Sequence, residues 1–231
     1  VSLEIHRCEV LGLVGESGSG KSTLGRSILR LVPITDGQIT FEGTELSALE
    51  GRSLKQFRHR MQMIFQDPYA SLNPRMTVYD TLAEPLLLHG LVNKAGLDQA
   101  IRELMDNVGL ARGFVRKYPH EFSGGQRQRI AIGRALATRP EFIVADEPVS
   151  ALDVTIQAQI LDLLADLTKE YGLTMLFISH DLAVIRQIAD RIAVLYHGKL
   201  VEEGSTAQVF DNPQQDYTRS LLAAIPGANA A

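Results

Sequence analysis

Residues 15–23 read Gly15-Glu16-Ser17-Gly18-Ser19-Gly20-Lys21-Ser22-Thr23, and this stretch decides the fold that the sequence predicts. It places a glycine four residues before Gly-Lys-Ser, follows the apolar run 10–14 and precedes a helix-compatible run over 22–31. Such a motif binds phosphate when it joins a strand to a helix. Its glycines let successive backbone N–H groups converge on a phosphate at the helix N-terminus. We therefore predict a phosphate loop over 15–23, the alternative being a flexible loop with a solvated lysine.

Two side chains of this loop and an acidic pair downstream suggest nucleotide chemistry. In a phosphate loop, Lys21 would reach the β- and γ-phosphate oxygens, and the Ser22 hydroxyl would bind Mg²⁺. Asp146 and Glu147 follow the apolar run 142–145, and ligands bind at the carboxyl ends of strands in open α/β sheets. We expect Asp146 to hold Mg²⁺, directly or through water, and Glu147 to orient or deprotonate an attacking water. Adjacent strand residues point to opposite faces, so the two carboxylates need not compete. An acidic pair that caps a turn is the alternative.

The composition limits the classes of protein that fit. With 231 residues, 45% of them hydrophobic, the chain can bury a sizeable core. The 23 Lys and Arg against 27 Asp and Glu give a net charge of −4, so no overall basic field attracts nucleic acid, and no nucleic-acid partner is expected. A single cysteine, Cys8, excludes an intramolecular disulfide and fits a reducing compartment. No apolar run reaches the ~18 residues that span a bilayer, so we expect any membrane association to be peripheral.

The sequence pattern divides the chain into three segments. Residues 1–66 form a mixed β region around the phosphate loop, with strands expected at 10–14, 38–42 and 61–66. Residues 67–136 carry helical periodicity and are expected to form an inserted helical subdomain, although helices that simply flank the sheet are the alternative. Residues 137–231 return to alternating strands and helices. The predicted fold is α/β: a P-loop NTPase core whose mostly parallel sheet has flanking helices, with an N-terminal antiparallel β region and the inserted helical subdomain. The helices are expected at 77–88, 97–108, 126–137, 154–171 and 181–190, and the late strands at 142–145, 174–178, 192–196 and 199–203.

A second anion-binding loop is expected at the start of the helix over 126–137. Ser123-Gly124-Gly125 opens this helix with bare backbone N–H groups at the positive end of the helix dipole. One nucleotide cannot easily use two such loops from a single chain.

Several motifs, taken in order, resemble those of one family. Gln66 follows an apolar strand, and the later motifs are Phe122-Ser123-Gly124-Gly125-Gln126-Arg127, Asp146-Glu147-Pro148, Ser150-Ala151-Leu152-Asp153 and Ile178-Ser179-His180-Asp181. Together they resemble the ATPase subunit of ATP-binding-cassette (ABC) transporters. The serine-glycine motif discriminates this family from other P-loop proteins, and the resemblance covers nearly the whole chain.

The resemblance implies partners and site roles. ATP would be hydrolysed with Mg²⁺ between two cassettes, identical or homologous, that pair head to tail. Each signature loop, defined here as Ser123, Gly124, Gly125 and Gln126, would cover the γ-phosphate held by the partner's phosphate loop. Gln66 would sense Mg²⁺ and the γ-phosphate, His180 would contact the γ-phosphate, and Asp153 would lie at the subunit interface. Transmembrane permease subunits, and indirectly an extracytoplasmic solute-binding protein, would complete the transporter. The subunit would lie peripherally on the cytoplasmic face of the cell (inner) membrane.

Two segments resemble the oligopeptide/dipeptide/nickel importer branch of that family, namely 66–74 and the tail 212–222. The resemblance implies import of peptides or a similar small nutrient. The alternative is a non-transport ABC ATPase that acts mechanically on DNA or ribosomes, and it would predict a basic surface, a coiled-coil insertion or two cassettes. A small GTPase would need Asn-Lys-x-Asp, and the chain has Asn93-Lys94-Ala95-Gly96. A P-loop kinase does not explain the signature loop.

The chain departs from the family pattern near its start. The family usually stacks adenine on an upstream aromatic residue, and the fourteen residues before Gly15 contain no Phe, Tyr or Trp. We therefore expect that sequence is missing at the N-terminus. Cys8 stands where the family pattern leads us to expect glycine, which would cost roughly 1 kcal/mol if the backbone there has positive φ.

Overall fold

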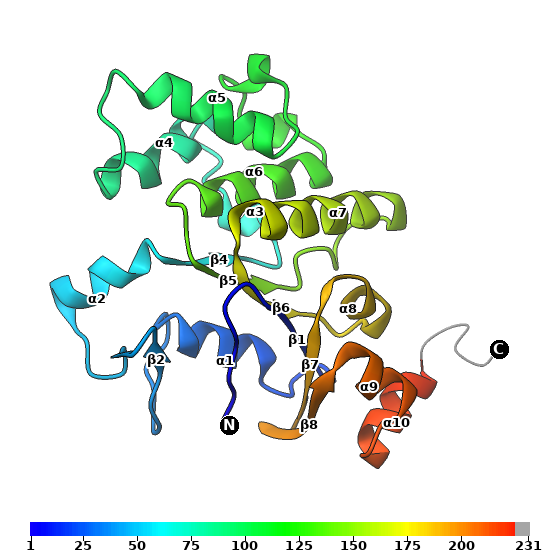
Figure 1. The fold of residues 1–231 in the computed structure, drawn as a ribbon. Coiled ribbons are helices and arrows are strands. Elements are labelled where there is room, and N and C mark those ends of the chain that lie inside the picture. The colour runs from blue at the N-terminus through cyan, green and yellow to red at the C-terminus, as the bar shows by residue number, and fades with distance from the viewer. Residues whose placement is uncertain (225–231) are drawn as a thin grey trace.

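A six-stranded sheet forms the centre of the computed structural model, which describes residues 1–224 (Figure 1). Its strand order is β4-β5-β6-β1-β7-β8, and every neighbouring pair is parallel except β7 and β8, which form an antiparallel hairpin. The mostly parallel sheet predicted from the sequence is thus confirmed. The strands are β1 (Val10–Val14), β4 (Met61–Ile64), β5 (Phe142–Asp146), β6 (Thr174–Ile178), β7 (Arg191–Tyr196) and β8 (Lys199–Ser205).

The sheet separates two hydrophobic cores, because successive strand residues face opposite sides. In β1, Val10 and Val14 join one core while Leu11 and Leu13 join the other. The first core packs under α4 (Val78–Leu88), α5 (Leu97–Asn107), α6 (Gly124–Leu136), α7 (Val154–Tyr171) and α8 (Leu182–Ile188). The second packs under α1 (Lys21–Ile28), α2 (Gly51–Arg58) and the antiparallel pair β2 (Thr40–Phe41) and β3 (Thr44–Glu45). Figure 1 shows α1 and α6 on opposite sides of the sheet.

Several boundaries differ from the sequence prediction. The strand expected over 38–42 is only two residues long, the strand expected over 61–66 ends at Ile64, and the helix expected over 22–31 ends at Ile28. Short helices went unpredicted because one or two turns hold too few apolar positions for a period to show. They are α2, α3 (Pro68–Ser71), α9 (Thr206–Asp211), α10 (Asp216–Ala223) and the 3₁₀ turns Arg112–Phe114 and Pro119–Glu121. Within residues 1–224, no helix combines the length and the apolar character that a membrane span requires.

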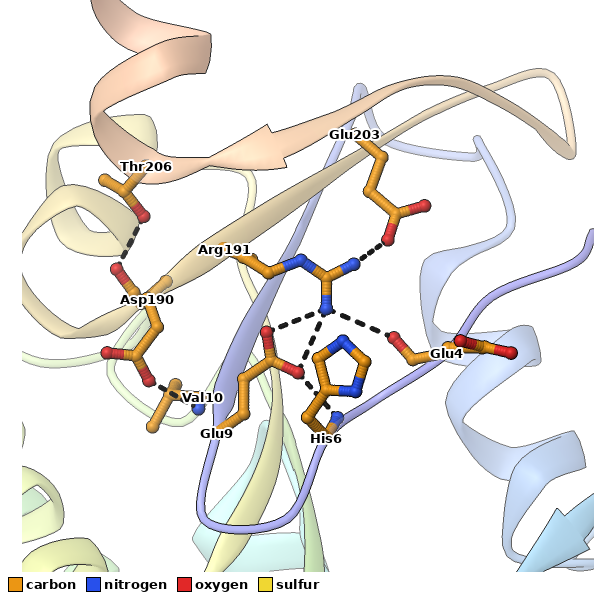
Figure 2. Close-up of polar contacts among 9 residues, drawn as sticks. Glu4, His6, Glu9, Val10, Asp190, Arg191, Glu203 and Thr206 are labelled. Atoms are coloured by element: carbon orange, nitrogen blue, oxygen red, sulfur yellow. Dashed lines mark hydrogen bonds and ion pairs between the residues drawn. The ribbon is translucent and has the colours of Figure 1, made fainter.

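The N-terminal segment is fastened to the β7–β8 hairpin at the amino edge of the sheet, where the parallel strands begin. Figure 2 shows Arg191 at the centre of this contact. Its guanidinium donates to both carboxylate oxygens of the buried Glu9, at 2.8 and 3.1 Å, and also pairs with Glu203 of β8. Asp190 accepts the Val10 N–H at 2.8 Å. These contacts fix the start of β1. The phosphate loop follows the opposite, carboxyl end of the same strand.

Cys8 lies in the turn before β1 and has a φ of 58°, so the positive φ considered from the sequence is present. Its N–H donates to Thr174 Oγ1 at 3.0 Å, and its thiol to the Gly172 carbonyl at 3.3 Å. A residue with a Cβ is therefore held in a conformation that favours glycine.

Candidate active site

The phosphate loop, residues 15–23, connects β1 to α1 at the carboxyl edge of the sheet. Gly20 caps α1 with a φ of 101°, which a side chain would disfavour. Gly15 is required for a different reason, since a Cβ there would lie 2.2 Å from the Leu195 carbonyl oxygen. The Ser19 hydroxyl is buried and has no hydrogen-bond partner in the described part of the chain. The loop is thus packed tightly yet retains unused polar groups, as a phosphate site would.

Lys21 is only 5% exposed and points back into the loop. Its Nζ donates to the carbonyl oxygens of Gly15 at 2.7 Å and Glu16 at 2.9 Å. Burial lowers the pKa of the Lys21 ammonium, and the carboxylates of Glu147 and Asp146 act in the opposite direction. A phosphate in the loop would supply the negative charge that this buried cation favours.

Asp146 is the last residue of β5 and shares its strand face with Val144, on the side that α1 covers. One carboxylate oxygen accepts the Ser22 hydroxyl at 2.7 Å. The other is buried without a hydrogen-bond partner among the described residues, and Arg26 Nη2 lies 3.7 Å away. Burial raises the pKa of Asp146, whereas the Ser22 bond and Arg26 lower it. An unsatisfied carboxylate oxygen beside a serine hydroxyl fits Mg²⁺, which takes one or two carboxylates and completes its shell with waters and phosphate oxygens.

Within residues 1–224, no three His, Cys, Asp or Glu side chains cluster as a metal site. A cation here would draw on Ser22, Asp146 and the amide of Gln66, together with oxygens of the nucleotide.

Glu147 turns out of the strand, so its direction is not set by strand alternation as the sequence argument assumed. Its φ is 47°, and its N–H donates to the Ile178 carbonyl at 2.9 Å. Backbone strain of this kind clusters at functional sites. The Glu147 Oε2 atom accepts a hydrogen bond from Gln66 Nε2 at 3.0 Å and lies 3.1 Å from His180 Nδ1. The left-handed turn therefore directs the Glu147 carboxylate toward two residues that follow other strands of the sheet.

The strand order explains why these three side chains meet. Gln66 follows β4 and His180 follows β6, and these strands flank β5 in the sheet. The His180 side chain is 58% exposed and that of Glu147 15%, so a ligand at the carboxyl edge can reach both. The structure thus brings together Lys21, Ser22, Asp146, Glu147, Gln66 and His180.

The signature loop lies elsewhere, at the start of α6. Ser123 Oγ accepts the Gln126 N–H at 3.4 Å, and Gln126 Oε1 accepts the Ser123 N–H at 3.1 Å. This capping box leaves the N–H groups between them without a partner inside the helix. Gly125 packs against α7, because a Cβ there would lie 2.4 Å from Ile156 Cγ2. Asp153 caps α7 by accepting the N–H of this same Ile156 at 3.0 Å, which places the start of α7 next to the signature loop.

No hydrogen bond joins the signature loop to the phosphate loop within residues 1–224, and their helices cover opposite faces of the sheet. Two residues near the phosphate loop were not anticipated. Arg26 lies one helical turn after Ser22, a spacing that could have indicated it. Tyr217, near the other end of the chain, accepts the Glu16 N–H at 3.0 Å. No local sequence pattern predicts that contact.

The chain is similar to known proteins in both sequence and fold. A family model described as ABC transporter matches residues 1–150. The chain is 57% identical to the oligopeptide transport ATP-binding protein OppF of Bacillus subtilis, covering 98% of this chain and 75% of that protein. It is 54% identical to the dipeptide transport ATP-binding protein DppF of Lactococcus lactis, covering 98% of this chain and 73% of that one. The solved ATP-binding cassette MJ0796, dimeric and bound to ADP and Pi, superposes with a TM-score of 0.79 at 32% identity over 88% of each chain.

Proposed function

The chain belongs to the ABC transporter family of ATPases, and from this premise we propose that it hydrolyses ATP to power import of peptides through a membrane permease. The observation that carries the proposal is the Glu147 carboxylate held by Gln66 and His180, beside the phosphate loop. The peptide cargo is supported by the OppF and DppF relatives, which are named for oligopeptide and dipeptide transport.

The phosphate loop would bind the nucleotide. Backbone N–H groups of residues 15–23, other than the Glu16 N–H bound by Tyr217, would cradle the phosphates, and Lys21 would exchange its carbonyl partners for phosphate oxygens. Ser22, Asp146 and Gln66 would hold Mg²⁺. When bound, the metal neutralises charge that builds up on the phosphates during transfer.

Glu147 would act as the general base. It would take a proton from the water that attacks the γ-phosphate, and the Gln66 and His180 contacts would hold its carboxylate in place. His180 is exposed enough to contact the γ-phosphate as well.

The signature loop would complete the site of a partner cassette. Its capped helix start offers free N–H groups and a positive dipole end, with Asp153 beside it at the interface. The dimer bound to ADP and Pi in the related MJ0796 cassette supports pairing of two cassettes, and we propose that this pairing is head to tail. In this arrangement each chain would supply the phosphate loop to one site and the signature loop to the other.

Co-purification tests the transporter assignment. The tagged protein carrying Glu147→Gln is isolated from gently solubilised native membranes with and without ATP, and its partners are identified by mass spectrometry. We expect a polytopic membrane protein and a second cassette, with ATP-dependent pairing that Lys21→Ala abolishes. Recovery of ribosomal or DNA-associated proteins, with no permease, would overturn transport in favour of a mechanical ABC ATPase.

Uptake measurements test the cargo. Cells that lack the protein are complemented with the wild type or Glu147→Gln and given labelled oligopeptides or nickel ions. Peptide uptake that requires Glu147 supports the proposal, and the solute-binding protein on which that uptake depends can then be identified by deleting candidates. Uptake of nickel alone would contradict peptide import.

A further inference from the structure

Residues from the C-terminal part of the chain pack against the phosphate loop. The turn of the β7–β8 hairpin contacts it first, since the Gly198 N–H donates to the Ser19 carbonyl at 2.9 Å. Behind this turn, α10 brings Tyr217 to the loop, where its hydroxyl accepts the Glu16 N–H at 3.0 Å. Figure 1 shows α10 beside β8, at the end of the described chain. Neither contact has a role in the hydrolysis mechanism proposed above.

The Tyr217 side chain is held from two directions. Its ring lies 4.2 Å from that of Tyr196, between centroids, and Tyr196 in turn packs edge-on against His197 at 4.3 Å. Tyr217 also packs against the first hydrophobic core. Burial raises the pKa of Tyr217, so its hydroxyl stays protonated and neutral at physiological pH. A fixed, neutral oxygen is therefore presented to the Glu16 amide.

Glu16 links this contact to the buried lysine. Its N–H is bound by Tyr217, while its carbonyl accepts the Lys21 ammonium at 2.9 Å. Both backbone polar groups of Glu16 are therefore hydrogen-bonded. The loop that contains Glu16 also has glycines at 15, 18 and 20, all with positive φ. Such a loop loses much conformational freedom when it orders, and a contact that orders it beforehand lowers that cost on ligand binding.

We infer that Tyr217 is a positioning residue, which braces the phosphate loop from the C-terminal helix and thereby tightens nucleotide binding. The inference rests on the proposed function, because it concerns the affinity of that loop for ATP and ADP. The Tyr217 hydroxyl is bound to the Glu16 N–H. Its effect passes through the Glu16 backbone, so it acts on affinity and not on the chemical step.

The test is the variant Tyr217→Phe, which removes one oxygen and keeps the ring. Binding of ADP with Mg²⁺ to the full chain is measured by calorimetry, since ADP is not hydrolysed. We expect the ADP dissociation constant and the KM for ATP to rise about two- to fivefold, the value of one modest hydrogen bond. We expect kcat and Tm to stay at the wild-type values. The matched control is Tyr171→Phe, which removes a hydroxyl that accepts from Asn107 at the other edge of the sheet.

A second measurement does not depend on nucleotide binding. In the nucleotide-free chain, the Glu16 amide should exchange its hydrogen faster in Tyr217→Phe than in the wild type or in Tyr171→Phe. Unchanged exchange, or unchanged affinity in a protein that binds ADP, would overturn the brace while leaving the ATPase assignment intact. A lowered Tm with unchanged affinity would also overturn it, because that result describes a merely structural contact. A wild type that binds no nucleotide would instead refute the proposed function, and the exchange experiment would still decide the brace.

Discussion

The phosphate loop and the signature loop both start a helix with glycines, yet the two differ in the polar side chains that their own chain places around them. Around the phosphate loop, Lys21 is buried, Ser22 is bound to Asp146, and Glu147 is held by two further residues. The signature loop, by contrast, is closed by its own capping box and packs against the start of α7. In the proposed mechanism, one loop belongs to a nearly complete site, whereas the other would bind an anion held by a partner chain.

This difference indicates how a switch can be built from identical parts. If each loop needs the opposite loop of a partner, hydrolysis requires pairing, and pairing can be made to depend on ATP. The two regions should therefore respond differently to substitution. Changes at the phosphate loop should act on the single chain, and changes at the signature loop only on the pair.

Lys21→Ala should have the largest effect, because it removes the buried cation of the phosphate loop. We expect loss of detectable ATP binding by calorimetry and a fall in turnover of at least about 100-fold. Lys169→Ala, at an exposed position in the last turn of α7, serves as the control and should behave as the wild type. Turnover at the wild-type rate in Lys21→Ala would refute the phosphate-loop assignment.

Glu147→Gln should separate binding from chemistry within the same region. The amide keeps the size of the side chain but cannot accept the proton, so turnover should fall about 10²- to 10⁴-fold while ATP still binds. Single-turnover hydrolysis and calorimetry measure the two effects. Normal hydrolysis would mean that Glu147 is not the base, and Glu170→Gln on the exposed end of α7 controls for loss of a carboxylate.

Ser123→Arg should act only on the pair. The large cation blocks the signature loop, so hydrolysis should fall by at least about tenfold whereas ADP affinity of the single chain stays unchanged. Equal hydrolysis by this variant and the wild type would argue against a composite site.

Mixing two inactive variants tests more directly whether the site is shared between two chains. In a head-to-tail pair of Ser123→Arg with Lys21→Ala, one site retains both an intact phosphate loop and an intact signature loop. Random mixing should therefore restore up to about a quarter of wild-type activity, since half of the pairs are mixed and each has one good site. No recovery, with mixed pairs shown to form, would contradict the split site.

The sequence predicted the parts of the fold that local pattern determines. The strands 10–14 and 174–178 are continuous apolar runs because both faces of the sheet are covered, and both match the structure. The helix over 154–171 also matches, since its five turns display a full apolar stripe. By contrast, α2 buries only Leu54, and so leaves almost no periodic signal.

The site was predictable where chemistry follows from spacing, as for Lys21, Ser22 and Asp146. The roles of Gln66 and His180 came from family resemblance, and their meeting at Glu147 depends on strand order, which no local pattern encodes. The left-handed turn at Glu147 is a strained exception to strand geometry. The contact of Tyr217 with Glu16 joins residues 201 positions apart, so only the folded chain shows it.

The smallest expected effect concerns the amino edge of the sheet, opposite both loops. Cys8→Gly should relieve a left-handed residue with φ of 58° and lose only a 3.3 Å thiol contact, so we expect a stability gain of about 0.5–1 kcal/mol, raising Tm by about 2 °C. Cys8→Ser retains the Cβ and should give no gain. ADP affinity and hydrolysis should not change, since stability at this edge is separate from function at the other. A fall in Tm for the glycine variant would show that the thiol contact outweighs the strain.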